Sequence, residues 1–254
     1  MSRSNDEDLK NPATHFLQWK GEKSIKKADG KIIEVDKHFF SYYNKEKKES
    51  IEVPLPVTFI VLDILHTING FNEEEGARYY SNEIKTKMFA THPFRVKLGK
   101  HDAAEGIYSE IMPALKGQGA KYCQSVYALM KEGDDWVINN FQLQGAAFGA
   151  WMEFCRNTNV MKCAVKVSEW IEGVKGNNTF NIPVFKAIPV SNETNNIAIE
   201  KDAELQKYLT KYFENNSEKA AHEKAEKYLA EETEPLPTLA EPLPTPGYAT
   251  DLPF

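Results

Sequence analysis

The chain has 254 residues, of which 41% are hydrophobic and 27% are charged, and its formal net charge is −6. This composition is ordinary for a soluble globular protein. The longest apolar runs, such as "FIVLDIL" at 59–65, are too short to span a membrane. Three cysteines without a CxxC pair argue against a disulfide framework and a zinc site, and we expect buried thiols.

The N-terminal dozen residues are polar and mixed in charge, which predicts a flexible arm over residues 1–12. They lack the apolar segment of a signal peptide, and we therefore expect a cytoplasmic protein.

Strand patterns dominate from residue 13 to about residue 192. "IIEVDKHFFSYYN", "SIEVPLP" and "VTFIVLDIL" are rich in β-branched and aromatic residues, as strands are. In "FRVKLG" the apolar side chains alternate with Arg95 and Lys97, which predicts a strand with one basic face. "KEGDD" and "KGNNT" lie between such segments and are predicted hairpin turns. Residues 13–192 therefore predict one mainly β domain.

Helical patterns are fewer. Ala146–Phe154 and the segment "IYSEIMPAL" predict two short helices, the first covering the end of a barrel. Residues 195–230 predict a helical segment whose apolar stripe contains Leu205, Tyr208 and Leu209. We expect this helix to break at Asn215–Ser217, with Ser217 as the N-cap of a second helix.

Residues 231–254 cannot build a core. They contain six prolines and five acidic residues but no Lys or Arg, and "EPLPT" occurs twice. Such a density of proline favours polyproline II and forbids regular helix or sheet. We therefore expect a disordered, acidic, proline-rich tail.

Motifs for catalysis are absent from the sequence. There is no GxxxxGK[ST], HExxH or GxSxG, and the six histidines show no metal-ligand spacing. The glycine pair in "KGQGAKY" reads as a turn before a strand. We expect neither enzymatic activity nor a cofactor or metal.

Charge is unevenly distributed along the chain. Residues 78–131 hold nine Lys or Arg against four Asp or Glu, whereas the tail is purely acidic. Single-stranded nucleic acid is bound by cations that follow its phosphates and by rings that stack on its bases. The candidate DNA-binding residues combine these two types: Trp19, Lys20, Tyr42, Tyr43, Arg78, Tyr79, Tyr80, Asn82, Lys85, Lys87, Phe89, Arg95, Lys97, Lys121 and Tyr122. In one extended strand, Tyr79, Lys85, Lys87 and Phe89 would share a face.

The last four residues are Asp251, Leu252, Pro253 and Phe254. They closely resemble the C-terminal tip of bacterial single-stranded DNA-binding proteins, in which acidic residues are followed by an apolar residue, Pro and Phe. The longer body and the single Asp beside "LPF" fit a phage-encoded or otherwise divergent member.

This resemblance implies an OB-type barrel with elaborations that binds single-stranded DNA with little sequence preference during replication, recombination and repair. It further implies that Asp251–Phe254 recruit partner proteins of those processes, in the cytoplasm of a bacterium or an infected host. Phe254 supplies a ring and a terminal carboxylate, which an apolar pocket with an Arg at its rim can bind together. A homo-oligomer is compatible with this plan.

An alternative of another class stays open at this point. The β-rich body would bind protein, as in a phage structural or adaptor protein, and the tail would be a docking peptide. In this reading most of the candidate rings belong to the core and the lysines are solvated.

Overall fold

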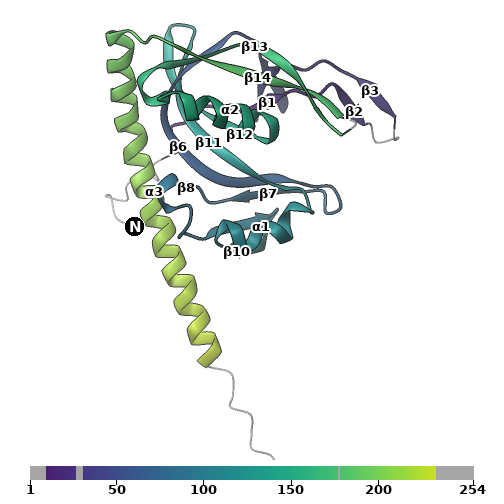
Figure 1. Cartoon of the computed structure of the whole chain (residues 1–254). Coiled ribbons are helices and arrows are strands. Elements are labelled where there is room, and N and C mark those ends of the chain that lie inside the picture. The colour runs from purple at the N-terminus through teal and green to yellow at the C-terminus, as the bar shows by residue number, and fades with distance from the viewer. Residues whose placement is uncertain (1–9, 27–30, 177, 233–254) are drawn as a thin grey trace, which may run out of the picture. The chain divides into compact units, whose positions relative to one another are not determined.

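The computed structural model describes residues 10–26, 31–176 and 178–232 (Figure 1). Most of the arm predicted over 1–12 and of the tail predicted over 231–254, including Asp251–Phe254, lies outside the described residues. The described chain is mainly β with a C-terminal helix, as predicted. The chain divides into two compact units, residues 1–208 and 209–254. The C-terminal helix α3 (Asn192–Glu232) begins in the first unit and continues into the second.

The strands are β1 (Phe16–Lys20), β2 (Ser24–Lys26), β3 (Ile32–Glu34), β4 (Phe39–Asn44), β5 (Glu49–Val53), β6 (Val57–Asn72), β7 (Ala77–Ser81), β8 (Ile84–Lys85), β9 (Phe94–Leu98), β10 (His101–Gly106), β11 (Ala120–Glu132), β12 (Asp135–Gln144), β13 (Ala164–Lys175) and β14 (Asn178–Ile188). The helices are α1 (Tyr108–Lys116), α2 (Gly145–Asn157) and α3 (Asn192–Glu232), with 3-10 turns η1 (Thr86–Met88) and η2 (Val160–Lys162).

The described strands form one large, branched sheet and a small two-stranded one. The main path runs β10-β9-β7-β6-β11-β12-β1-β4-β5, and β8 and β13 also pair with β6. The strands at the two ends of this path, β10 and β5, do not pair with each other, so the described sheet is not closed into a barrel. The faces of the described sheet therefore do not line the interior of a closed barrel.

The antiparallel pair of β6 and β11 is the centre of the sheet. It extends from Ala120 opposite Gly70 to Met130 opposite Phe59, and Figure 1 shows the two strands bending together. The apolar run at 59–65 lies within β6 and packs in the core. The ring of Phe59 stacks on Phe141 of β12 at 4.4 Å between centroids, which links three neighbouring strands in one core.

Both short helices are confirmed, and each covers its own apolar cluster along the β6–β11 pair (Figure 1). Trp151 of α2 is fully buried in the larger cluster, and its Nε1 donates a hydrogen bond of 2.7 Å to Gln124 of β11. In the second cluster Met112 of α1 packs with Ile68 and Phe94. The two helices cover one face of the sheet. The opposite face also buries Leu65, Tyr127 and Leu129 in its central part.

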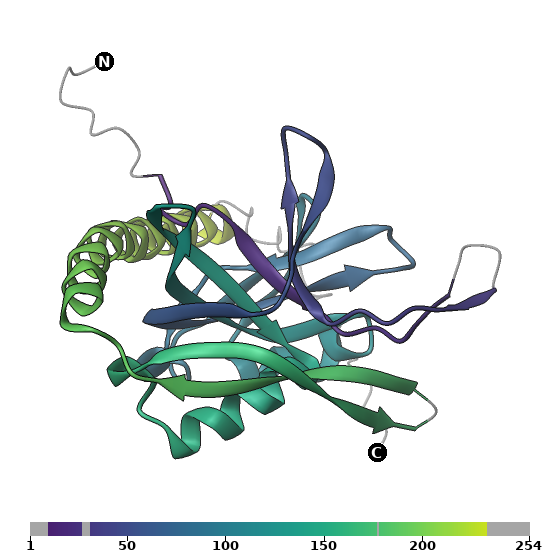
Figure 2. The ribbon, with the colours of Figure 1, turned by 90° about the horizontal axis from the view of Figure 1, so that it is seen from above.

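Both predicted hairpin turns are confirmed. Glu132 pairs with Asp135 across the turn between β11 and β12, and Lys175 pairs with Asn178 between β13 and β14. Figure 2 shows β2–β3 and the end of the β13–β14 hairpin extending side by side.

The predicted break in the C-terminal helix is wrong, because α3 is continuous through Asn215–Ser217. Asn and Ser cost only about 0.5 kcal/mol each in a helix interior. A break would leave several backbone groups without intrahelical partners and would require a new helix nucleus. The cheaper solution is to continue the helix.

Two glycines allow β6 and β11 to approach closely where their pairing begins. A Cβ on Gly119 would lie 2.2 Å from the carbonyl oxygen of Phe71, and one on Gly70 would lie 2.2 Å from that of Gly119. Both glycines also have positive φ, +93° at Gly119 and +150° at Gly70. No side chain fits at either position without separating the strands.

We predict that Gly119→Ala destabilises the fold more than Gly133→Ala does. Gly133 has a φ of +61° but open space around its Cβ position, so alanine there costs only backbone strain, about 1–2 kcal/mol. At Gly119 the clash with the Phe71 carbonyl adds to that strain. Urea unfolding of the two variants measures the difference, and equal losses would contradict the close approach.

Candidate nucleic-acid interface

One row of side chains crosses four strands on the face opposite α1 and α2. Lys97 of β9 stands opposite Tyr80 of β7, and Tyr80 stands opposite Asn69 of β6. Asn69 in turn stands opposite Lys121 of β11. Paired residues point to the same side of a sheet, and adjacent strands are about 4.8 Å apart, so the row spans about 14 Å.

A second row beside it adds another cation and another ring. Arg78 of β7 stands opposite Phe71 of β6, and both lie two residues from members of the first row. The alternation along β9 likewise places Arg95 on the side of Lys97. We call the surface formed by these residues the basic–aromatic face: Asn69, Phe71, Arg78, Tyr80, Arg95, Lys97 and Lys121.

The rings and most of the cations of the basic–aromatic face reach solvent. Tyr80 is 48% exposed and Phe71 is 47% exposed, so both rings are accessible to a ligand. Arg78, Lys97 and Lys121 are exposed, and Arg95 is partly buried. Cations interleaved with accessible rings can neutralise phosphates and stack on bases, which is the chemistry that single-stranded nucleic acid requires.

The surrounding hydrogen bonds hold this face in place. The Tyr80 hydroxyl donates a hydrogen bond of 2.6 Å to the Gly99 carbonyl, which fixes the ring while its face stays accessible. Asn82 accepts a bond of 2.7 Å from the backbone N–H of Arg95 and donates one of 3.3 Å to the Pro93 carbonyl. Asn82 therefore ties the end of β7 to β9.

Two other predicted rings lie on the opposite face of the sheet. Tyr122 stands opposite Ile68 and packs between Tyr108 of α1 and Phe148 of α2, at 5.3 and 4.9 Å between centroids. Phe89 joins this cluster at 5.8 Å from Tyr122. Burial raises the pKa of the Tyr122 hydroxyl, so it stays protonated at neutral pH. The structure thus separates Tyr122 and Phe89 from the basic–aromatic face.

His66 supports this aromatic cluster from β6. Its Nδ1 contacts the Tyr122 hydroxyl and its Nε2 lies 2.9 Å from the Thr86 hydroxyl. Burial lowers the pKa of the His66 imidazole, which is therefore neutral at pH 7. The cluster is a packed, uncharged junction between the two cores.

The predicted common face of Tyr79, Lys85, Lys87 and Phe89 is wrong, because the segment is not one strand. β7 ends at Ser81, β8 contains only Ile84 and Lys85, and η1 follows at once. Tyr79 is only 2% exposed, and its hydroxyl donates to Gln118 at 3.0 Å. Its ring belongs to the core.

The two predicted lysines of this segment, Lys85 and Lys87, belong to neither row of the basic–aromatic face. Lys85 stands opposite Leu65 and is partly buried, whereas Lys87 is exposed on η1.

The N-terminal candidates lie on β1 and β4, near the other end of the strand order from β7 and β9. Trp19 packs against the larger core and its Nε1 donates a bond of 2.8 Å to the Asn181 carbonyl. Tyr42 also packs on this core and stacks on His15 at 3.8 Å. Lys20 is partly buried at the end of β1, while Tyr43 is 61% exposed. These residues form no continuous surface with Tyr80 and Lys97.

Sequence reasoning missed Phe71 and Asn69, which complete both rows from the end of β6. They follow a long buried run and therefore read as part of the core. Gly70 between them was the available signal, because an isolated glycine in a strand marks a close backbone approach.

Glu83 is a second residue that sequence reasoning missed. Its carboxylate accepts hydrogen bonds from the hydroxyls of Ser125 and Tyr127, the latter at 2.8 Å, and from the amide of Asn140. Desolvation raises the pKa of the Glu83 carboxyl despite these donors, and the nearby negative charge of Asp63 raises it further. An enclosed carboxyl of this kind anchors the short β8 segment to β11.

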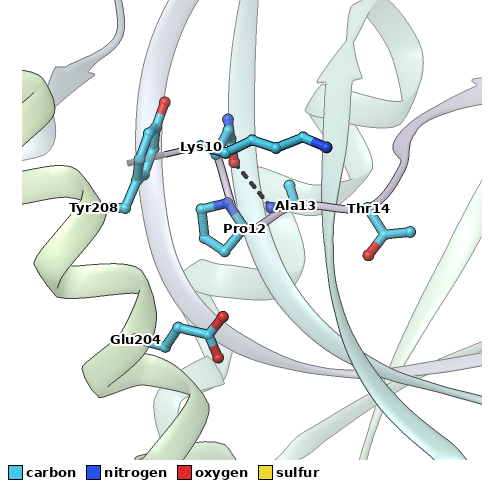
Figure 3. A pocket seen from close by; sticks show the side chains of 7 residues that line it. Lys10, Pro12, Ala13, Thr14, Glu204 and Tyr208 are labelled. Carbon is cyan, nitrogen blue, oxygen red and sulfur yellow. Dashed lines mark hydrogen bonds between the residues drawn. The ribbon is translucent and has the colours of Figure 1, made fainter. Parts of the chain in front are cut away.

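A pocket of about 420 Å³ lies between the N-terminal segment and α3 (Figure 3). Figure 3 shows Lys10, Pro12 and Thr14 on one side and Glu204 and Tyr208 on the other. It offers one cation, one acid and one ring, which is not the mixture found on the basic–aromatic face.

Across the described part of the chain, no three His, Cys, Asp or Glu side chains gather into a group that could hold a metal ion. Among the same residues, no helix has the length and apolar character to cross a membrane.

Comparisons with protein-family models, with curated proteins and with solved structures find no match to the chain.

We predict that Glu83→Gln stabilises the fold relative to the natural chain increasingly as pH rises. The folded pKa of Glu83 lies above its unfolded value, near 4.5, so its ionisation costs stability at higher pH. The glutamine has no such cost. Urea unfolding at pH 5 and pH 8 measures the change, with the exposed Glu46→Gln as control. A stability difference that does not vary with pH would show that Glu83 is not desolvated.

Proposed function

We propose that this chain is a non-enzymatic single-stranded DNA-binding protein. In this proposal the basic–aromatic face binds the strand with little sequence preference, during replication, recombination or repair. The C-terminal tip Asp251–Phe254, which lies outside the described residues, recruits partner proteins of those processes.

The observation that carries the proposal is the row Lys97–Tyr80–Asn69–Lys121. Its residues come from four strands between positions 69 and 121, and only the sheet register brings them together. A ring between two lysines allows a base to stack while the neighbouring phosphates meet cations. Sequence preference is weak in such an arrangement, because every base has a π-face.

The fold supports the proposal as a platform of the OB type. An OB-fold binds oligonucleotides across an exposed sheet face. Here one face of the curved sheet is occupied by α1, α2 and the two apolar clusters, while the rings and most of the cations of the basic–aromatic face stay exposed and the amide of Asn69 is buried between them. The proposed strand crosses β9, β7, β6 and β11 on that side.

We predict that Tyr80→Ala weakens binding to oligo-dT by about 5- to 150-fold. Loss of one base–aromatic stack costs about 1–3 kcal/mol. Tyr43→Ala on β4 is the matched control, because Tyr43 is at least as exposed but stands outside both rows. Fluorescence anisotropy with labelled oligo-dT measures both variants. A loss confined to Tyr43→Ala would place the strand elsewhere.

We predict that Lys121→Ala weakens binding and lowers the slope of log K against log salt by about 0.7, the value for one phosphate contact on a single strand. Lys131→Ala is the control, since Lys131 is exposed near the other end of the same strand, β11. Salt titrations from low ionic strength measure both slopes. Equal slopes for the two variants would show that the row does not contact phosphate.

Failure of the unsubstituted chain to shift oligo-dT at low salt would contradict the proposal altogether. That result, together with stable self-assembly, would favour the alternative of a protein-interaction or assembly factor.

A further inference from the structure

The edge strand β10 carries acids that face the cations of β9. Asp102 stands opposite Lys97, and their side chains form an ion pair of 3.3 Å between Nζ and Oδ1. Glu105 stands opposite Arg95. Both cations that β9 contributes to the basic–aromatic face are thus matched by a carboxylate on the neighbouring strand.

A β-bulge is what brings both acids to this face. Residues 102 and 105 are three apart, so a regular strand would point them to opposite faces. The register shifts between Asp102 and Ala104, so that Ala103 is an extra residue, and the alternation restarts after it. Asp102 and Glu105 therefore both stand opposite cations of the same side.

We infer that β10 is a built-in competitor for phosphate, with Asp102 setting the affinity of the face through Lys97. This inference rests on the proposed function. A phosphate that reaches Lys97 must displace Asp102, whereas no acid among the described residues forms an ion pair with Lys121. The ion pair is easily opened, because the Lys97 side chain is 46% exposed and that of Asp102 is 86% exposed.

The competitor keeps binding reversible. In the unbound protein Lys97 is paired with the Asp102 carboxylate rather than with mobile counterions. When Lys97 then binds a phosphate, fewer counterions are released into solution. The charge of the face in the unbound protein is also lower than its four cations indicate.

The test compares Asp102→Asn with Asp134→Asn in the full-length chain, with labelled oligo-dT as the probe. Asp134 is an exposed acid in the β11–β12 turn and controls for the change in net charge. Asp102→Asn is expected to tighten binding about two- to fivefold at low salt and to steepen the salt slope by about 0.7. Asp134→Asn is expected to change both values little.

Combination with Lys97→Ala isolates the ion pair. In that background the effect of Asp102→Asn should shrink to that of Asp134→Asn, since the carboxylate no longer has its cation. Binding by the unsubstituted chain without tightening in Asp102→Asn would overturn this inference alone, as would equal tightening with and without Lys97. No binding by the unsubstituted chain would overturn the proposed function and this inference with it.

Discussion

The antiparallel pairing of β6 with β11 is the constraint on which the rest of the structure depends. Both cores are built on one face of this pair, and the helices α1 and α2 cover that face. The register of the same pair places Lys121 beside Asn69 and so extends the basic–aromatic face to a fourth strand. At its end, Gly70 and Gly119 allow the two backbones to approach at a distance that no side chain tolerates. A single register therefore decides which residues of β6 and β11 pack with α1 and α2 and which lie on the side of Lys121.

The exposed face balances opposing electrostatic demands. Arginines and lysines on neighbouring strands repel one another, and an edge strand with unpaired backbone groups invites pairing with another chain. The acids of β10 relieve the repulsion at β9 and place charge on that edge. In the proposed function the same acids limit affinity, so that a bound strand can be released.

The sequence predicted the local elements well and the site only in part. Alternation in 94–98, the two hairpins and both short helices are confirmed, because each depends on residues close in sequence. Composition could not distinguish Tyr79 from Tyr80, yet Tyr79 is buried in the core and Tyr80 is exposed. Tyr122 lies on the opposite face because it alternates with Lys121 along β11, and Phe89 joins it because the chain leaves the sheet at η1. The continuity of α3 through Asn215–Ser217 shows that weak helix formers do not by themselves end a helix.

Ultraviolet cross-linking of oligo-dT to the full-length chain, followed by mass spectrometry of the linked peptides, tests the central claim most directly. If the basic–aromatic face binds the strand, the cross-links fall on Tyr80 and Phe71, the two rings displayed there. Cross-links confined to Phe89, Tyr108 and Tyr122 would contradict this account, because those rings belong to the cluster on the other side of the sheet.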